Sequence, residues 1–280
     1  MQMYAENLRA SGQRIGVVPT MGYLHDGHVS LLHTAKKHAE VIIMTIFVNP
    51  MQFGPNEDYQ NYPRDEARDR LLAEAAGCDI LFIPGAGSLY PEGFKTHVEV
   101  ETITTILEGA IRPTHFRGVT TIVTKLLHIT KPHVVVFGQK DAQQVSVIRQ
   151  MIRDLNFDIT VIVAPTVRES DGLAMSSRNI YLSERERHDA LLLSQSLFAA
   201  EQRIRSGERD AATVERFMNT MISSSPSVQL DYISIVDEAS LAPILHIMED
   251  RRTLIAVAAR VGKTRLIDNI IIDFRKDDHE

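Results

Sequence analysis

The sequence predicts an α/β protein: a Rossmann-like, doubly wound parallel sheet followed by a smaller C-terminal α+β domain. Apolar runs of strand length recur with helical patterns between them, over residues 15–18, 41–48, 80–83, 134–137 and 159–163. These runs are nearly continuous rather than alternating, as is typical of parallel strands covered on both faces. From about residue 176, helical patterns are followed by strands instead. We therefore expect two domains, residues 1–175 and residues 176–280.

Bulk properties exclude several classes of protein. The 280 residues can bury a sizeable core, and 44% of them are hydrophobic and 24% charged. The net charge of -6 argues against nucleic acid or a membrane surface as a partner, because both require basic stripes. No apolar run can cross a bilayer, residues 1–7 lack the pattern of a secretory signal, and Cys78 is the only cysteine. We expect a cytoplasmic protein without an internal disulfide.

The stretch between the first strand and the next helix carries two histidines. A helix over residues 1–13 is expected to lead to the strand at 15–18, and residues 29–39 have apolar side chains at helical spacing. The intervening residues 19–28 read PTMGYLHDGH, which predicts a glycine-bearing turn.

His25 and His28 are three residues apart, so both rings can project to one side where the helix begins. Unpaired N–H groups and the positive end of the helix dipole favour a bound anion there. Two imidazoles at that place can donate hydrogen bonds to phosphate and stabilise charge that develops at phosphorus. The alternative is a pair of capping or surface histidines. A zinc protease site is not indicated, because the HExxH pattern is absent.

The next elements continue the alternation of strands and helices. Residues 41–48 deliver Gln52 to the rim where open α/β sheets bind ligands. Its amide suits a substrate with hydroxyl and carboxylate groups, although it could equally bond to neighbouring backbone. An amphipathic helix over residues 64–76, closed by Gly77, and a glycine-rich connection over residues 84–96 follow. Arg117, just before a helix expected to run to residue 128, is a candidate anion contact that ranks below the others, because an arginine at such a place is usually a solvated cap.

A further group of polar residues follows the strand at 134–137. Gly138 permits close approach of a nucleotide, and Lys140 provides a cation for phosphates. Asp141 could accept a ribose hydroxyl or cap the following helix. Gln144 lies one helical turn after Lys140, so both can face one pocket.

The C-terminal part begins with a loop over residues 170–177. Arg178 follows it and could bind phosphate oxygens through two N–H groups, the alternative being a surface turn. A capping box, Ser183 to Glu186, starts a long helix. A second helix and three strands are then expected over residues 210–223, 230–236, 253–261 and 265–272.

Four segments together resemble the pantoate–β-alanine ligase (pantothenate synthetase) family of the HxGH nucleotidylyltransferase superfamily. They are PTMGYLHDGH at 19–28, FVNPMQF at 47–53, FGQKDAQQ at 137–144 and MSSRN at 175–179. They occur in the family's order, and the resemblance covers nearly the whole chain. The chain departs from the family at Gln139, where glutamate is common, and in an N-terminal strand that is shortened or absent.

The resemblance implies an ATP-dependent ligase that condenses pantoate with β-alanine through a pantoyl adenylate. Residues 1–175 would bind nucleotide and pantoate, and residues 176–280 would form a lid. His28, His25, Lys140 and Arg178 would be catalytic, and Gln52 and Gln144 would contact pantoate. Val167 would touch adenine through its backbone, or serve only in packing. The ATP-binding residues would be Met21, Gly22, Tyr23, Leu24, His25, Asp26, Gly27, His28, Gly138, Gln139, Lys140, Asp141, Val167, Met175, Ser176, Ser177 and Arg178.

The resemblance also implies Mg²⁺ bound with ATP and a homodimer, while no dedicated metal cage is visible in the sequence. One alternative function is a nucleotidylyltransferase acting on a phosphorylated acceptor. Gln52 and Gln144 argue against it, because neutral amides suit an unphosphorylated hydroxy acid. Another alternative is a nucleotide-binding sensor without turnover, which would not require His25, His28 and both cations together.

Overall fold

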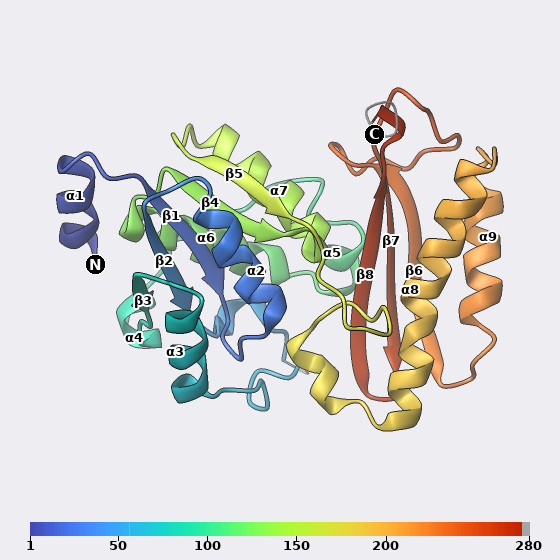
Figure 1. Cartoon of the computed structure of the whole chain (residues 1–280), viewed down its shortest axis with the longest axis horizontal. Helices are drawn as coiled ribbons and strands as arrows, with labels where there is room; N and C mark the ends of the chain where they lie inside the picture. Colours follow the sequence, from blue (N-terminus) through green and yellow to red (C-terminus); the bar gives the residue numbers. More distant parts are fainter. Residues whose placement is uncertain (56, 276–280) are drawn as a thin grey trace. The chain divides into compact units, whose positions relative to one another are not determined.

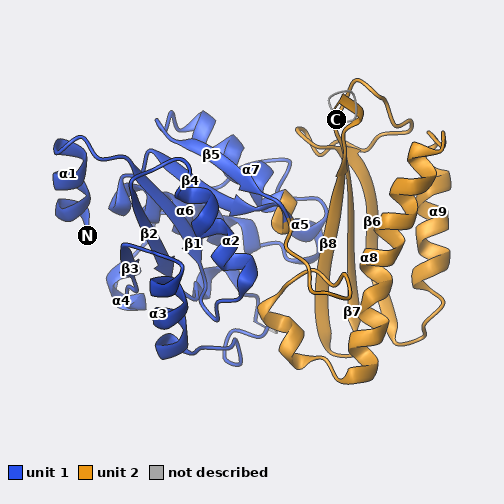
Figure 2. Cartoon of the chain, viewed as in Figure 1, with its two compact units in different colours: residues 1–139, 143–165 blue, residues 140–142, 166–280 orange. Residues whose placement is uncertain are grey.

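The computed structural model describes residues 1–55 and 57–275. By its contacts, the chain divides into two compact units (Figure 2). The first unit comprises residues 1–139 and 143–165, and the second comprises residues 140–142 and 166–280. The domains expected at 1–175 and 176–280 stay a prediction, because a grouping by contacts does not test whether a segment folds or moves independently.

The first unit is built on a parallel sheet, which has five strands in the described part of the chain (Figure 1). The strands are β1 (Ile15–Thr20), β2 (Val41–Ile46), β3 (Ile80–Phe82), β4 (Val134–Gly138) and β5 (Thr160–Ala164). Their order in the sheet is β3-β2-β1-β4-β5, so the direction of winding reverses between β1 and β4. Open α/β sheets bind ligands at the carboxyl ends of the strands at such a switch point. The predicted doubly wound sheet is confirmed.

Helices cover both faces of this sheet. They are α1 (Gln2–Ala10), α2 (Asp26–Ala35), α3 (Glu66–Ala75), α4 (Ala86–Leu89), α5 (Glu108–Ile111), α6 (His115–Thr130) and α7 (Ala142–Asp154), with 3₁₀ turns η1 (Pro50–Gln52) and η2 (Gln139–Asp141). Val134 and Val136 of β4 belong to the apolar core with α2, whereas Val135 and Phe137 belong to the core with α6 and α7. Because α6 begins at His115, Arg117 lies in its first turn, and the prediction that this arginine precedes the helix was wrong.

The second unit is the predicted α+β arrangement. Its antiparallel sheet, three-stranded over the described residues, contains β6 (Val228–Asp237), β7 (Thr253–Val261) and β8 (Thr264–Ile272). The helices α8 (Glu184–Arg205) and α9 (Ala211–Ile222) lie side by side against it (Figure 1), and Leu193 and Leu197 of α8 share a core with Ile255 and Val257 of β7. The expected capping box of Ser183 and Glu186 starts α8, and a 3₁₀ turn, η3 (Ser177–Tyr181), precedes it.

Membrane-spanning segments were sought among the same described residues. None of their helices is both long enough and apolar enough to cross a bilayer.

Candidate functional site

The turn after β1 contains two residues with positive φ, and only one of them is a glycine. Gly22 has φ 86° and Tyr23 has φ 51°, so both occupy the left-handed region. A Cβ on Gly22 would lie 2.9 Å from Cγ2 of Ile46, so glycine is required there by space as well as by conformation. Tyr23 has no such freedom, and its left-handed conformation must be held by the surrounding contacts.

His25 and His28 bond reciprocally at the start of α2. The Gly27 N–H donates to His25 Nδ1 (3.1 Å), and the His25 N–H donates to His28 Nδ1 (3.3 Å). The ring centroids are 4.1 Å apart. Because each Nδ1 accepts a backbone N–H, the neutral rings carry their proton on Nε2. Both predicted catalytic histidines are thus brought together as a pair of Nε2–H donors at a helix N-terminus.

Gln52 is held in place by buried polar neighbours. Asn49 Nδ2 donates to Gln52 Oε1 (3.1 Å) and to Gly118 O (3.0 Å), while Tyr90 Oη donates to Asn49 Oδ1 (2.8 Å). Gln52 Nε2 lies 3.0 Å from the sulfur of Met21. Asn49 is 1% exposed and Gln52 is 8% exposed. Two predicted site residues, Met21 and Gln52, are therefore in contact, and the orientation of the Gln52 amide is fixed by Asn49.

A second group of residues, missed by the sequence prediction, holds the backbone of Gln52. His115 Nδ1 is 2.9 Å from Gln52 O, so Nδ1 carries the proton and donates it; Arg112 Nη2 donates to the same oxygen (3.2 Å). Arg112 also pairs with Glu57 at 2.6 Å. Burial and the Arg112 charge lower the pKa of His115 to about 4. Burial acts to raise the pKa of Glu57, but Arg112 outweighs it and holds that pKa below its usual value.

Adjacent glutamines on α7 differ in their surroundings. Gln143 is buried, and its Nε2 donates to Ile103 O and Ile106 O, both at 2.8 Å, while its Oε1 accepts the Glu108 N–H (3.0 Å). Gln143 therefore fixes a loop of the first unit. Gln144 is only half-buried. Its contact with pantoate stays a prediction.

The segment after β4 carries the predicted phosphate lysine. A Cβ on Gly138 would meet only Leu31 Cδ2, at 3.8 Å, so packing does not by itself require glycine there. Lys140 Nζ lies 3.7 Å from Asp141 Oδ1. The Lys140 carbonyl accepts a hydrogen bond from Asn269 Nδ2 (2.8 Å), and Asn269 is 4% exposed. A buried amide of β8 thus anchors the backbone of this lysine, a contact that 129 residues of separation hide from any sequence motif.

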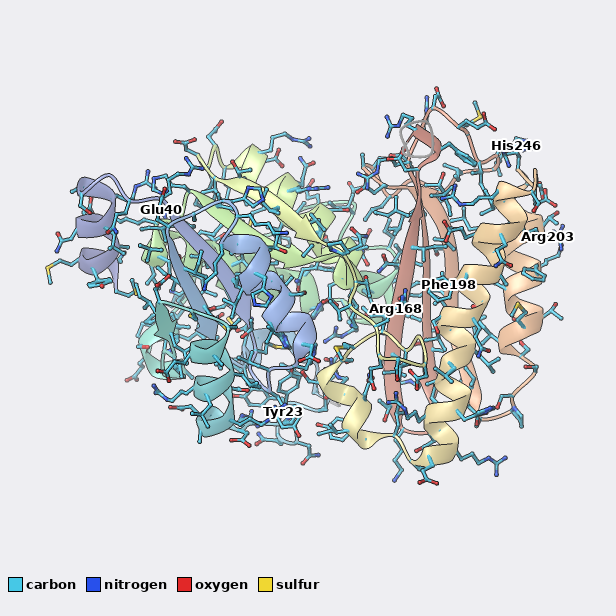
Figure 3. All side chains as sticks on the ribbon, viewed as in Figure 1. Tyr23, Glu40, Arg168, Phe198, Arg203 and His246 are labelled. Carbon is cyan, nitrogen blue, oxygen red and sulfur yellow. The ribbon has the colours of Figure 1, made fainter. Side chains whose placement is uncertain are left out.

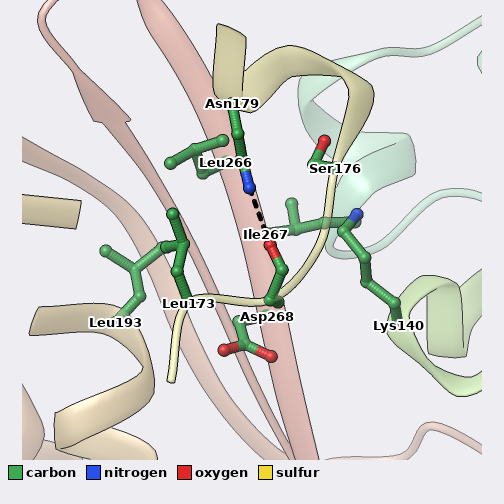
Figure 4. A pocket seen from close by; sticks show the side chains of 9 residues that line it. Lys140, Leu173, Ser176, Asn179, Leu193, Leu266, Ile267 and Asp268 are labelled. Atoms are coloured by element: carbon green, nitrogen blue, oxygen red, sulfur yellow. Dashed lines mark hydrogen bonds between the residues drawn. The ribbon is translucent and has the colours of Figure 1, made fainter. Parts of the chain in front are cut away.

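A small pocket in the second unit joins two of the predicted ATP-binding residues (Figure 4). Lys140 and Ser176 line it together with Asn179 and Asp268, and its apolar lining includes Leu173, Leu193 and Leu266. Asn179 Nδ2 donates across the loop to Ala174 O (3.1 Å), the bond drawn in Figure 4. The surface of this pocket is almost entirely apolar, so the pocket places Lys140 and Ser176 near each other without forming a polar binding surface.

The loop that carries Ser176 is folded back on itself. The Met175 N–H donates to Val167 O (3.0 Å), and Ser176 Oγ accepts the Arg178 N–H (3.2 Å), so that Ser176 caps η3. Ser177 is buried, whereas Arg178 is half-buried. The predicted ATP-binding residues Val167, Met175, Ser176, Ser177 and Arg178 therefore lie in one hydrogen-bonded loop of the second unit.

An ion pair fixes the base of the same loop. Arg168 donates to both oxygens of Asp268, at 2.6 and 2.9 Å, and its guanidinium lies 4.8 Å from the centre of the Phe198 ring (Figure 3). Arg168 and Asp268 are 100 residues apart in the chain, and the sequence prediction missed both.

Metal-binding groups were sought over residues 1–55 and 57–275. No cluster of three or more His, Cys, Asp or Glu side chains that could hold a metal ion was found among them.

Comparison with known proteins gives one consistent result. A family model described as pantoate-beta-alanine ligase matches residues 1–271. A pantothenate synthetase of Chloroherpeton thalassium is 54% identical over 274 residues, which cover 98% of this chain and 96% of the relative.

Solved structures agree with this match. The crystal structure of pantothenate synthetase from Thermus thermophilus has a TM-score of 0.89 at 44% identity, covering 95% of this chain and 96% of that one. Pantoate-beta-alanine ligase from Francisella tularensis, in complex with beta-gamma ATP and beta-alanine, has a TM-score of 0.76 at 36% identity, covering 96% and 95%. The chain therefore belongs to the pantoate–β-alanine ligase family.

Proposed function

We propose that this chain condenses (R)-pantoate with β-alanine to give pantothenate, with ATP cleaved to AMP and pyrophosphate. The observation that supports this most strongly is the reciprocal bonding of His25 and His28. It presents two Nε2–H donors where α2 begins, beside the switch point of the sheet, in a chain whose relatives are named pantothenate synthetases.

The first half-reaction activates the acid. A carboxylate oxygen of pantoate attacks the α-phosphorus of ATP, the bond to pyrophosphate breaks, and pantoyl adenylate forms. The Nε2–H groups of His25 and His28 donate hydrogen bonds to the phosphoryl oxygens as negative charge develops there. His28 is the better candidate for proton donation, a step that would require its imidazolium form. Lys140 and Arg178 balance the charge of the departing pyrophosphate, and the hydroxyls of Ser176 and Ser177 add hydrogen bonds.

The second half-reaction forms the amide. The amine of β-alanine attacks the acyl carbon of the adenylate, and the bond between that carbon and the phosphate oxygen of AMP breaks. Direct condensation would be unfavourable because a carboxylate is a poor electrophile; adenylation supplies a good leaving group.

Pantoate binding is assigned to the two neutral amides, Gln52 and Gln144. Gln52 is aligned by Asn49, and the cation nearest to its backbone, Arg112, is paired with Glu57. This arrangement suits a hydroxy acid better than a phosphorylated acceptor, because the two side chains assigned to the acid are neutral amides.

The nucleotide is assigned to the segments around Lys140 and Ser176. Packing does not require a glycine at Gly138, so close approach of ATP accounts for its presence, with Asp141 on the ribose and the Val167 backbone on adenine. Mg²⁺ is proposed as an ion bound to the phosphates of ATP, where it would neutralise part of their charge. A homodimer and a cytoplasmic location complete the proposal.

The direct test is product analysis with purified protein, ATP and pantoate, with and without β-alanine. Pantoate-dependent exchange of pyrophosphate into ATP is expected without β-alanine, and stoichiometric AMP and pantothenate only when β-alanine is present. Nucleotidyl transfer to a phosphorylated acceptor, with no dependence on pantoate, would instead identify the chain as a nucleotidylyltransferase. ATP binding without any turnover would identify a sensor.

A further inference from the structure

We infer that Asp69 of α3 is a positioning residue for adenylation, which acts by holding the turn that carries the histidine pair. Asp69 is 1% exposed, and its carboxylate accepts two consecutive backbone N–H groups. Tyr23 N–H donates to Oδ2 and Leu24 N–H donates to Oδ1, both at 2.7 Å. This inference rests on the proposed function, since it assigns Asp69 to one half of that reaction.

The Asp69 carboxylate stabilises the left-handed backbone conformation of Tyr23. A non-glycine residue at φ 51° persists only where surrounding contacts impose the conformation. Short hydrogen bonds to an ionised acceptor are among the strongest available to a backbone N–H. The same carboxylate explains Gly22, because a Cβ there would lie 3.0 Å from Asp69 Oδ2.

Arg68, the residue before Asp69 on the same helix, also contacts the turn. Its Nη1 donates to Leu24 O (2.9 Å), and its guanidinium lies 5.2 Å from the centre of the ring of Tyr23, the residue labelled in Figure 3. Two consecutive side chains of α3 therefore contact both the N–H and the carbonyl of Leu24.

Leu24 connects this anchor to the chemistry. The next residue, His25, is the N-cap of α2, and both of its contacts with His28 and Gly27 depend on where its backbone lies. Displacing a catalytic group by about 1 Å can cost roughly 100-fold in rate, because the reacting atoms must stay aligned. The carboxylate of Asp69 bonds to Tyr23 and Leu24 and not to the two imidazoles, so it acts on the reaction by fixing the position of the turn.

The decisive variant is Asp69→Asn, which keeps the volume but places an NH₂ group opposite one of the two N–H donors. We expect pantoate-dependent ATP–pyrophosphate exchange to fall about 30-fold. Acyl transfer to β-alanine from supplied pantoyl adenylate should change less than about threefold, because it forms no new bond to phosphorus.

The matched control is Asp65→Ala on the same helix. Asp65 caps α3 by accepting the Arg68 N–H (3.0 Å) and is bonded to no residue of the turn. It should lower the urea concentration at which the protein unfolds while leaving the exchange rate of the folded protein within about threefold of the parent. If Asp69→Asn does not fold, Arg68→Met replaces it, with a smaller fall, about fivefold, and the same split between half-reactions.

A readout without turnover separates positioning from stability. In protein labelled with ¹⁵N-histidine, the signals of His25 and His28 should report the Nε2–H tautomer in the parent and in Asp65→Ala, and lose it in Asp69→Asn. Parallel losses in both half-reactions, an unchanged exchange rate, or an unchanged tautomer would each overturn the inference. Absence of pantoate-dependent exchange in the parent protein would refute the proposed function instead.

Discussion

The two segments assigned to ATP are anchored by different kinds of interaction. The turn over residues 21–28 is held by backbone N–H groups that donate to Asp69, His25 and His28. The loop over residues 166–178 is held by arginine side chains: Arg168 pairs with Asp268, and Arg187 pairs with Glu169 and Asp171. The turn is thus fixed by directional bonds to its own backbone, whereas the loop depends, in addition to its own backbone bonds, on attraction between charges that solution conditions can weaken.

The ion pairs of the loop differ in how far their side chains are exposed to solvent. The side chains of Arg168 and Asp268 are 17% and 3% exposed, whereas those of Arg187, Glu169 and Asp171 are 34%, 28% and 32% exposed. Buried pairs are costly to break, because the remaining charge has no solvent, whereas exposed pairs contribute little. The comparison therefore predicts effects of very different size within one loop.

The largest expected effect comes from Arg168→Met, which leaves the buried Asp268 carboxylate unpaired. The free energy of unfolding should fall by about 3 kcal/mol, measured by urea denaturation. The double variant Arg168→Met/Asp268→Leu should lose less than the single one, because no buried charge remains. A larger loss in the double variant would show that packing, not charge, anchors the loop.

On the side of the turn, His28→Ala should lower the rate of pantoate-dependent ATP–pyrophosphate exchange by about 100-fold, the scale for loss of a transition-state donor. His33→Ala is the control, since it removes an exposed imidazole from the last turn of the same helix. Near-normal adenylate formation by His28→Ala would refute the catalytic role of the pair.

Acid should act on the first unit through His115. The folded protein keeps this ring neutral down to about pH 4, whereas the unfolded chain binds a proton below about pH 6.5, so stability is lost as the pH falls across that window. The loss should be about 2 kcal/mol, allowing for partial exposure. Urea denaturation at both ends of the window should show it in the parent but not in His115→Gln. Equal losses in the two proteins would assign the acid sensitivity to other groups.

The smallest effect is expected for Arg187→Ala, with a loss of less than about 1 kcal/mol that shrinks further at high salt. Burial acts to raise the pKa of Asp171, but the Leu173 N–H and Arg187 hold that pKa below its usual value. A carboxyl with a lowered pKa stabilises the fold above its ordinary pKa and loses that contribution as the pH falls through the lowered value. Denaturation at low and high salt checks this, and a salt-independent loss would contradict it.

Much of the fold could be predicted because its signals are local. The apolar run over residues 134–137 shows a strand by itself, and the two-sided core around it follows from the alternation of Val134 to Phe137. The capping box of Ser183 and Glu186 marks the start of α8 within four residues. The spacing of His25 and His28 predicts that their rings lie on one side, but only the neighbouring motifs and the family resemblance favour a joint role over capping or surface histidines.

The supporting contacts could not be predicted in the same way. Asp69 lies in a helix whose pattern is simply amphipathic, and nothing in that pattern indicates that its carboxylate is buried against Tyr23 and Leu24. Asn269 lies in an apolar strand, and its bond to the Lys140 carbonyl depends on how distant segments pack. The residues proposed to orient the site are thus recognised only from tertiary contacts, whereas those proposed to perform the chemistry lie in local motifs.

The membership of residues 140–142 in the second unit has a consequence for protein engineering. Within the described residues the backbone passes from one unit to the other after Gln139, after Ala142 and after Pro165. A gene fragment for residues 166–280 would therefore lack residues 140–142, which belong to the same unit. The amide of Asn269 would then lose the Lys140 carbonyl to which it donates. Any fragment built from this half should keep residues 140–142 in the chain, whereas a chimera can draw them from either parent, because a residue of any type at position 140 supplies that carbonyl.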